Sequence, residues 1–302
     1  FGKVSVFSDL NNLNDISMSP WYYDVCGISE AELERDFRED VEALATAQGM
    51  AYDDCVARLK HMYDGYHFDA GTPGVYNPFS LLNTFAKLKF GYYWFETGTP
   101  TYLVKLLQLH NYDLNEMANE QTSEDVLNSI DAASTNPIPV IYQSGYLTIK
   151  DYDPEFELYT LGFPNEEVEK GFVRYLMPFY TTVNQGKTAF EISRFVKEIE
   201  AGDCDAFFTR LRSFYADIPY EMQRDLEVHY QNVLFIVFRL MGFHVGVEYH
   251  TSNGRVDLVL KTKARIYVME FKFDGTAEEA MQQIDEKGYA TPFMADGRQV
   301  VK

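Results

Sequence analysis

The chain of 302 residues is long enough for about two domains. With 46% hydrophobic and 16% aromatic residues it can form sizeable hydrophobic cores, which excludes a disordered polymer. Its net charge of −20 argues, taken over the whole chain, against a nucleic-acid partner. No apolar run reaches the roughly 18 residues of a membrane-spanning helix, and the three scattered cysteines have neither disulfide nor zinc-site spacing. We therefore expect a cytoplasmic protein without a membrane partner.

The acidity is concentrated in the first four-fifths of the chain. From residue 242 to 302, eight Lys and Arg residues stand beside nine Asp and Glu residues, so this stretch carries only −1 of the total of −20. A site that acts on phosphates is therefore expected in the last fifth. The chain begins with Phe1 rather than Met and stops at Lys302 inside what reads as a strand, so we expect a fragment of a longer protein.

The first elements are a short strand and a group of helices. Residues 3–8 alternate as a strand. The segment SEAE fits a capping box, with Ser29 as the cap and Glu32 three residues later, and apolar residues then follow at helical spacing. A second helix is predicted over residues 51–62.

An aromatic-rich loop, residues 63–79, follows, with turn signals at its Asp-Gly and Pro-Gly pairs. Helices are predicted over residues 80–88 and 99–109. GYLTIKDY and FELYTLG, separated by an Asp-Pro turn, then read as a β-hairpin. Helices before a hairpin favour a winged-helix-like unit.

Three further helices are predicted over residues 164–180, 189–201 and 203–215, the first with Asn165 as a cap. Pro219 marks the expected boundary between two domains, residues 1–219 and 220–302. The second begins with an amphipathic helix over residues 225–241.

The remaining pattern predicts strands over residues 244–251, 255–261 and 266–273, a helix capped by Thr276, and a last strand near Gln299. The order of elements is α-β-β-β-α-β. The fold class is therefore α/β together with a mainly helical region.

Charged residues interrupt the apolar strands of GRVDLVLKTKARIYVMEFK. Because side chains alternate along a strand, Glu270 and Lys272 share one face. A four-residue hairpin loop at 262–265 would place Asp257 opposite Glu270, with Cβ atoms about 5 Å apart. Two such carboxylates repel each other, and a divalent cation would remove the repulsion. Lys272 could hold a water or a phosphate oxygen, so we predict metal-assisted phosphodiester hydrolysis.

This D-x12-E-x-K pattern in an α-β-β-β-α-β order resembles the PD-(D/E)XK nuclease superfamily, whose domains are restriction-endonuclease-like. The sequence is similar to a bacterial branch in which an AAA-ATPase-like region precedes a C-terminal nuclease domain, in the segments EVHYQNVLFIVFRLMGFHV, GRVDLVL and YVMEFKFDGTAEEAMQQIDEKGYA. Five earlier segments of this chain resemble the ATPase-like part of that branch: FGKVSVFSDLNNLNDIS, MYDGYHF, VYNPFSLL, YQSGYLTI and LGFPNEEV. Residues 1–219 would then be a lid-like and winged-helix-like remnant. No GxxxxGK[ST] phosphate loop occurs in the sequence, so we expect no ATPase activity from this chain.

The resemblance implies that Asp257 and Glu270 are ligands of Mg²⁺, or of Mn²⁺, with the backbone carbonyl of Phe271 as a third ligand. Lys272 would stabilise or activate the attacking water. The expected substrate is DNA in preference to RNA. One departure is Val256, which stands where the motif's name has Pro.

Two helices add residues to the implied site. Glu227, on the helix that opens the domain, would be an auxiliary acid, although acids near a helix start also stabilise its dipole. Gln283, on the later helix, would contact nucleic acid or position the site. Tyr289 matches the same motif, but packing is the favoured explanation for it.

Other interpretations of these charged residues remain open. Asp257, Glu270 and Lys272 would also fit a partly buried ion pair on the sheet. The domain would then be a catalytically inactive interaction module, with the acidic front portion binding protein partners. Arg255 could contact a phosphate or balance nearby acids.

Basic residues at the hairpin tip, Lys261, Lys263 and Arg265, would suit a DNA backbone, but a solvated turn is the favoured explanation. The aromatic-rich loop at residues 63–79 suggests base stacking, but its turn signals and acidic surroundings favour packing. The six histidines lack zinc spacing, so no ligand role is assigned to them.

Overall fold

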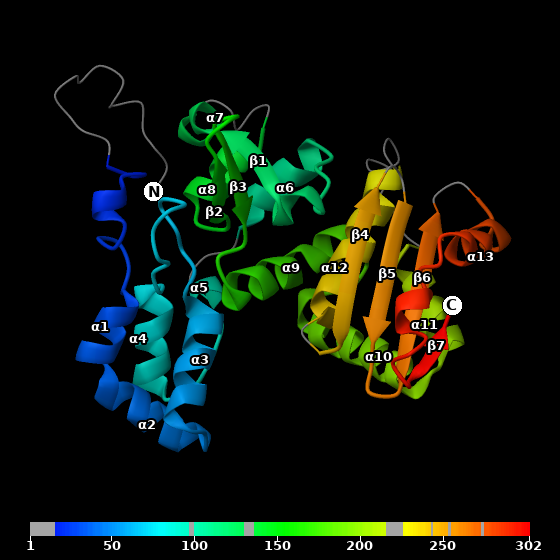
Figure 1. Ribbon diagram of the computed structural model, residues 1–302, viewed down its shortest axis with the longest axis horizontal. Helices are drawn as coiled ribbons and strands as arrows, with labels where there is room; N and C mark the ends of the chain where they lie inside the picture. The colour runs from blue at the N-terminus through cyan, green and yellow to red at the C-terminus, as the bar shows by residue number, and fades with distance from the viewer. Residues whose placement is uncertain are drawn as a thin grey trace. The chain divides into compact units, whose positions relative to one another are not determined.

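The computed structural model describes residues 16–96, 100–129, 136–215, 226–242, 244–252, 255–272 and 275–302, and the strand expected at residues 3–8 lies outside them. Residue contacts divide the chain into two compact units, residues 1–110 with 116–172 and residues 111–115 with 173–302. The fold is mixed α/β and mainly helical, with a small sheet in each unit (Figure 1). None of the described helices is both long and apolar enough to cross a bilayer.

The first unit begins with the predicted capping box. The Ser29 hydroxyl accepts a hydrogen bond from the Glu32 backbone N–H, and the Glu32 carboxylate accepts one from the Ser29 N–H. The helical pattern that follows is split into α1 (Glu30–Asp36) and α2 (Arg38–Gln48). The break falls at Phe37, whose φ of −116° and ψ of 16° leave the helical range.

Helices α3 (Tyr52–Tyr63) and α4 (Pro78–Lys87) complete the helical core of this unit. α4 begins two residues before the predicted start, because the Asn77 side chain caps it by accepting hydrogen bonds from the N–H groups of Phe79 and Ser80. The core consists of fully buried side chains that include Leu33, Val41, Leu44, Leu59 and Leu81.

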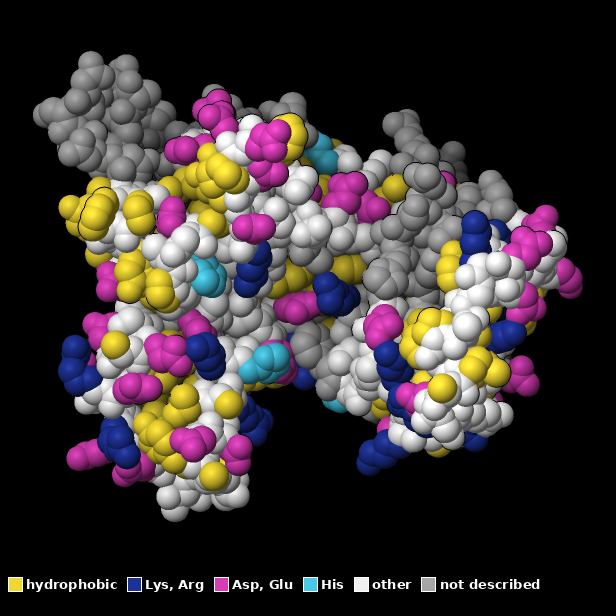
Figure 2. All heavy atoms as spheres, viewed as in Figure 1, with side chains coloured by type: hydrophobic (Ala, Val, Ile, Leu, Met, Phe, Trp, Pro, Cys, Tyr) yellow, Lys and Arg dark blue, Asp and Glu magenta, His cyan; other side chains and the backbone are white. Residues whose placement is uncertain are grey.

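The rest of the first unit contains short helical segments: Pro20–Tyr22, α5 (Tyr93–Glu96), α6 (Thr101–Leu109), Glu116–Ala118, α7 (Glu124–Asn128) and α8 (Ile138–Gln143). On the face shown in Figure 2, acidic side chains of this unit are interspersed with Lys and Arg at its lower end, whereas at its upper end acidic side chains are visible with few basic ones. The acidity on this face is therefore uneven.

The predicted hairpin is confirmed, as β2 (Thr148–Asp153) pairs with β3 (Leu158–Gly162). A third strand, β1 (Glu120–Ser123), pairs with β3 and was not expected, because its sequence EQTS has no apolar alternation. The winged-helix-like assignment of this region stays a prediction. The following helix, α9 (Glu166–Tyr180), is capped as expected by Asn165, whose side chain accepts from the Val168 N–H.

The second unit contains α10 (Thr188–Ala201) and α11 (Cys204–Phe214), close to their predicted bounds, and the turn Gln185–Lys187. Arg210 joins these two helices, with guanidinium nitrogens 2.6 Å from the Glu198 carboxylate and 2.7 Å from that of Glu191. This ion pair is largely shielded from solvent, which makes it stronger than an exposed one.

The predicted α-β-β-β-α-β order is confirmed, and it runs α12 (Leu226–Gly242), β4 (Gly246–Ser252), β5 (Arg255–Lys261), β6 (Arg265–Lys272), α13 (Ala277–Glu286) and β7 (Gln299–Val301). The sheet order is β4-β5-β6-β7. The first three strands are antiparallel, whereas β7 is parallel to β6. A helical turn, Thr291–Phe293, precedes β7.

The two faces of β6 are covered by different helices. On one face, the Tyr267 hydroxyl donates to the Ile199 carbonyl of α10 at 2.7 Å, and the Phe271 ring lies 5.8 Å from the Phe238 ring of α12. On the other face, Val268 packs with Ile284 of α13. Alternation along the strand puts Glu270 and Lys272 on the face that α13 covers, and Figure 1 shows α13 beside β6.

Candidate active site

The register of the sheet brings the two acidic positions together. Asp257 of β5 pairs directly with Glu270 of β6, which confirms the pairing expected from the hairpin loop. On the other side of β5, the position that pairs with Asp257 is His250. Positions that pair directly in neighbouring strands share a face of the sheet. His250 was not among the predicted site residues, although the same pairing arithmetic extended to β4 would have found it.

The next pair on this face consists of two basic positions, Arg255 of β5 and Lys272 of β6. Like charges directly opposite each other destabilise a sheet. Two opposed acidic positions followed by two opposed basic positions are therefore costly unless diagonal ion pairs or bound ligands offset the repulsion. A cation beside the acidic positions and a phosphate beside the basic positions would offset both repulsions.

Glu270 and Lys272 lie partly buried on β6. Both carboxylate oxygens of Glu270 are shielded from solvent, and the Lys272 ammonium donates a hydrogen bond of 2.6 Å to the Gln283 side-chain oxygen. The structure thus brings together Lys272 and Gln283, two of the predicted site residues that lie on different elements. A hydrogen bond to a charged group is stronger than a neutral one and fixes the ammonium in place.

Gln283 owes its position to the start of α13. The Thr276 side chain accepts from the Glu279 N–H, and the Glu279 carboxylate accepts from the Thr276 N–H, which completes a capping box. Ile284, the next residue, is buried against Val268 and fixes the rotation of the helix. Gln283 is therefore held by both the cap and the packing.

The other predicted residues have different surroundings. Glu227, in the first turn of α12, accepts a hydrogen bond of 3.4 Å from Gln231, one helical turn later. Tyr289 packs against the small core around Val268, as the packing interpretation expected. The carbonyl of Phe271 lies on the strand between Glu270 and Lys272.

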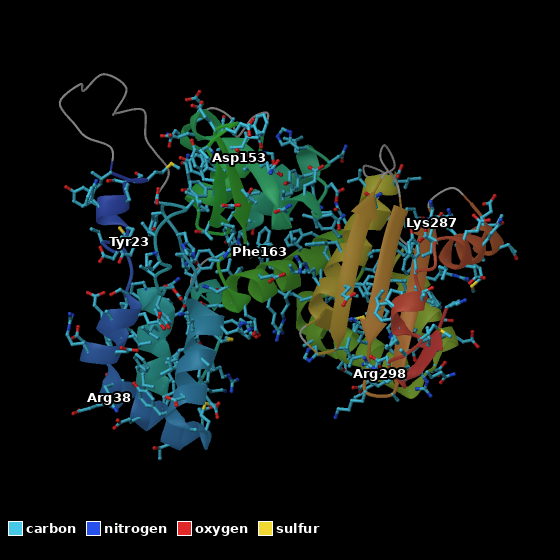
Figure 3. All side chains as sticks on the ribbon, viewed as in Figure 1. Tyr23, Arg38, Asp153, Phe163, Lys287 and Arg298 are labelled. Carbon is cyan, nitrogen blue, oxygen red and sulfur yellow. The ribbon has the colours of Figure 1, made fainter. Side chains whose placement is uncertain are left out.

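The basic residues of the hairpin tip lie at the opposite end of the strands from Lys272. Lys261 is paired with Glu248, and Arg265 donates to the Gln299 side chain and the Glu200 carbonyl. Figure 3 labels Lys287, near the Lys272 end of the sheet, and Arg298, near the tip. Because Lys261 and Arg265 already bind the protein itself, their contacts support the solvated-turn interpretation of the tip.

The donor set fits a hard divalent cation. The two opposed acids and the neighbouring carbonyl supply only oxygen ligands, which suit Mg²⁺ or Mn²⁺ better than a thiolate- or imidazole-seeking metal. Within the described side chains, which do not include that of Asp257, no group of three His, Cys, Asp or Glu is arranged to hold an ion.

Residues 225–302 match the family model of the PD-(D/E)XK nuclease superfamily. Over 314 aligned residues the chain is 31% identical to a protein of Azotobacter chroococcum mcd 1, described as an uncharacterized protein in the vnfD 5' region. The alignment covers 99% of this chain and 57% of that protein, so the chain spans a little more than half of its relative. No solved structure matches the chain. The strand order, the paired acids and the family match agree, and residues 225–302 form a PD-(D/E)XK nuclease superfamily domain.

Proposed function

We propose that this domain hydrolyses phosphodiester bonds, with DNA as the substrate and Mg²⁺ or Mn²⁺ as the cofactor. The observation that carries the proposal is the pairing of Asp257 with Glu270 beside a Lys272 ammonium that is held by Gln283. Nucleases of this superfamily generally depend on a divalent metal, which supports the choice of cofactor.

Each residue of the site has a distinct role in the proposal. Asp257, Glu270 and the Phe271 carbonyl would hold the cation, which when bound would offset charge on the phosphate and help to activate water. Lys272 would hold the attacking water against the phosphorus or neutralise charge that develops on the phosphate. Arg255, at the position opposite Lys272, would hold a phosphate oxygen of the nucleic-acid backbone.

Cleavage of labelled DNA with Mg²⁺ or Mn²⁺ tests the proposal. We expect Asp257→Asn, Glu270→Gln and Lys272→Met each to lower the cleavage rate about 100-fold or more, because the first two weaken the site that would hold the cation and the third removes the positive charge beside the reacting phosphate. Glu200→Gln and Lys263→Met are matched controls, since both side chains are exposed and lie at the hairpin-tip end of the sheet, where the Glu200 carbonyl accepts a hydrogen bond from Arg265. We expect the controls to stay within about twofold of the parent chain, as surface charges contribute little.

If all three site variants cleave DNA as fast as the parent chain, the proposal is refuted. A chain that neither cleaves nor binds Mn²⁺ in calorimetry would instead support the inactive interaction module. Single- and double-stranded DNA and RNA of one sequence, compared in the same assay, would define the substrate. The ATPase-like ancestry of residues 1–219 and their binding of protein partners also belong to this proposal and rest on the sequence resemblance and on the acidic composition.

A further inference from the structure

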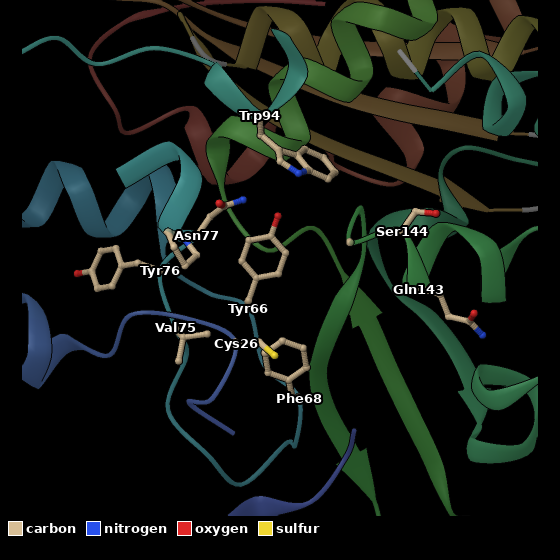
Figure 4. Close-up of a pocket in the computed structure, with 11 residues that line it drawn as sticks. Cys26, Tyr66, Phe68, Val75, Tyr76, Asn77, Trp94, Gln143 and Ser144 are labelled. Atoms are coloured by element: carbon tan, nitrogen blue, oxygen red, sulfur yellow. The ribbon is translucent and has the colours of Figure 1, made fainter. Parts of the chain in front are cut away.

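Three sequence motifs that phosphodiester cleavage does not use meet around one cavity in the first unit. MYDGYHF contributes Tyr66 and Phe68, VYNPFSLL contributes Asn77, and YQSGYLTI contributes Ser144. Trp94 of α5 lines the same cavity, which has a volume of about 240 Å³ (Figure 4). We name this cavity the aromatic pocket. With Cys26, which also lines it, its residues come from five separate stretches of sequence, which is typical of a binding site.

The backbone around the aromatic pocket is held by hydrogen bonds between these motifs. Tyr66 and Val75 exchange backbone hydrogen bonds of 3.3 and 3.0 Å. The Thr148 hydroxyl accepts from the His67 N–H at 2.7 Å and donates to the His67 carbonyl at 2.8 Å. The walls are therefore formed in advance, and a ligand would not have to order them.

Trp94 is also fixed by contacts on the side away from the cavity. Its backbone N–H donates to the Glu167 carboxylate at 3.0 Å, and Glu167 is fully buried. The Trp94 ring packs against Tyr146, with 4.8 Å between ring centroids. Gly145 lies beside both walls, since a Cβ atom built on it would be 3.7 Å from Trp94 and 3.8 Å from Tyr66. A larger residue there would enter the space between the two rings.

Most of the aromatic-rich loop is packed, as the turn signals suggested. Tyr63 and Tyr76 are fully buried, and in Figure 4 the Tyr76 side chain points away from Tyr66. Tyr66 and Phe68 are different, because both are only partly buried and line the cavity. Their rings provide apolar faces against which a flat ligand would stack.

The edge of the aromatic pocket is polar and uncharged. Asn77 uses its side-chain oxygen to cap α4, and its side chain also lies close enough to the Tyr66 hydroxyl to lower the pKa of Tyr66 against the larger effect of burial. A tyrosine hydroxyl keeps its proton at neutral pH, and burial raises the pKa of Tyr66 further, so this hydroxyl has a proton to donate. The Ser144 side chain lies at the exposed rim. Gln143 does not add to this edge, because its amide donates to the carbonyls of Leu127 and Ser129.

We propose that the aromatic pocket binds an uncharged heteroaromatic ring, a free nucleobase or nucleoside. The rings of Tyr66, Phe68 and Trp94 would stack on its faces, and polar groups would bond its edge. All residues that line the pocket belong to the described part of the chain, and none of them is charged. A phosphate would find no cation there, and the buried Glu167 carboxylate behind Trp94 would repel it. This site is independent of the proposed nuclease activity.

The chain offers a built-in reporter, because it has only two tryptophans. Trp21 is 86% exposed and lies outside the pocket, so Trp21→Phe leaves Trp94 as the single tryptophan, whose emission can be excited apart from that of the tyrosines. We expect adenosine, guanosine, cytidine or thymidine to change the Trp94 emission saturably, and the matching 5′-monophosphate to bind at least tenfold more weakly. Calorimetry on the same samples would detect any binding that does not change the Trp94 emission.

The nucleoside affinities of variants test whether binding occurs in the aromatic pocket. Phe68→Ala removes one wall and should weaken binding about 5- to 150-fold, the range expected for one stacked base. Phe156→Ala is its matched control, since this ring is 66% exposed in the turn between β2 and β3, and its affinity should not change. Tyr66→Phe keeps the ring and loses the donor, so we expect a loss of about 2- to 10-fold.

Far-ultraviolet circular dichroism of each variant shows that the fold is retained. No saturable binding of any nucleoside at millimolar concentration would overturn the proposal. Equal affinity of Phe68→Ala and Phe156→Ala, or preferential binding of choline as a cationic probe, would overturn it as well. Glu270→Gln should bind the nucleoside normally, because that variant changes only the separate nuclease site.

Discussion

At the residue scale, the contact between Lys272 and Gln283 links β6 and α13, two of the elements that form the candidate active site. The ammonium and the side-chain oxygen are 2.6 Å apart. A hydrogen bond to a charged group is worth about 1.5–3 kcal/mol, so we expect Gln283→Ala to lower the rate constant for cleavage at least about tenfold. We expect little change in the KM for DNA, because Gln283 would act through Lys272 and would not touch the substrate.

The conservative variant Gln283→Glu separates positioning from packing, because it keeps an oxygen acceptor for Lys272. We expect it to recover most of the activity that Gln283→Ala loses. Gln282→Ala, one residue earlier and exposed on the same helix, is the matched control. If both Gln283 variants cleave as fast as this control, Gln283 has no part in positioning Lys272.

His229 of α12 provides a pH-dependent test of the second unit. It is only 5% exposed, its ring stacks with Tyr180, and burial lowers its pKa. Below a pH of about 6.5 the unfolded chain binds a proton there that the folded chain does not. The stability that the neutral ring contributes is thus present above this pH and is lost as the pH falls.

We therefore expect the free energy of unfolding to drop between pH 7 and 5, with a contribution from His229 of up to about 1.4 kcal/mol per pH unit. Urea denaturation at several pH values measures this slope. His229→Phe should flatten it, whereas His244→Gln, at an exposed position in the same unit, should not. An unchanged slope in His229→Phe would show that other groups cause the acid sensitivity.

At the element scale, the capping box of α13 connects helix stability to the site. Thr276→Ala removes the acceptor for the Glu279 N–H and should cost about 1 kcal/mol of unfolding free energy. Thr276→Ser keeps the acceptor and should cost much less. Hydrogen exchange in the first turn of α13 should speed up only in the alanine variant, and similar exchange in both variants would argue against the cap.

Local sequence patterns predicted these elements where local interactions decide the structure. The capping box at Ser29, the helix cap at Thr276 and the register of Asp257 with Glu270 depend on residues close in sequence, and all three are confirmed. β1 was missed because it forms only by pairing with β3, about 40 residues away. The bond from Lys272 to Gln283 depends on how α13 packs on β6, which no sequence pattern specifies.

At the scale of the whole molecule, the compact units and the predicted domains divide the chain at different places. The sequence predicts a domain boundary at residues 219/220, and the family match begins at residue 225. By contrast, contacts group α10 and α11 with the sheet. Phe238 of α12 is fully buried with Phe207 of α11 nearby, and Tyr267 of β6 donates to the Ile199 carbonyl of α10.

These contacts predict how fragments of the chain will behave. Residues 220–302 alone would expose Phe238 and leave Tyr267 without its acceptor, so we expect this fragment to lack a cooperative unfolding transition. Residues 173–302 keep both contacts and should unfold cooperatively. Neither fragment contains Leu114, whose N–H donates to Asn232, so the loss of that bond is common to both. Urea denaturation followed by tyrosine fluorescence compares the two. A cooperative transition in residues 220–302, at the same urea midpoint, would show that α10 and α11 are dispensable and would support the boundary predicted from the sequence.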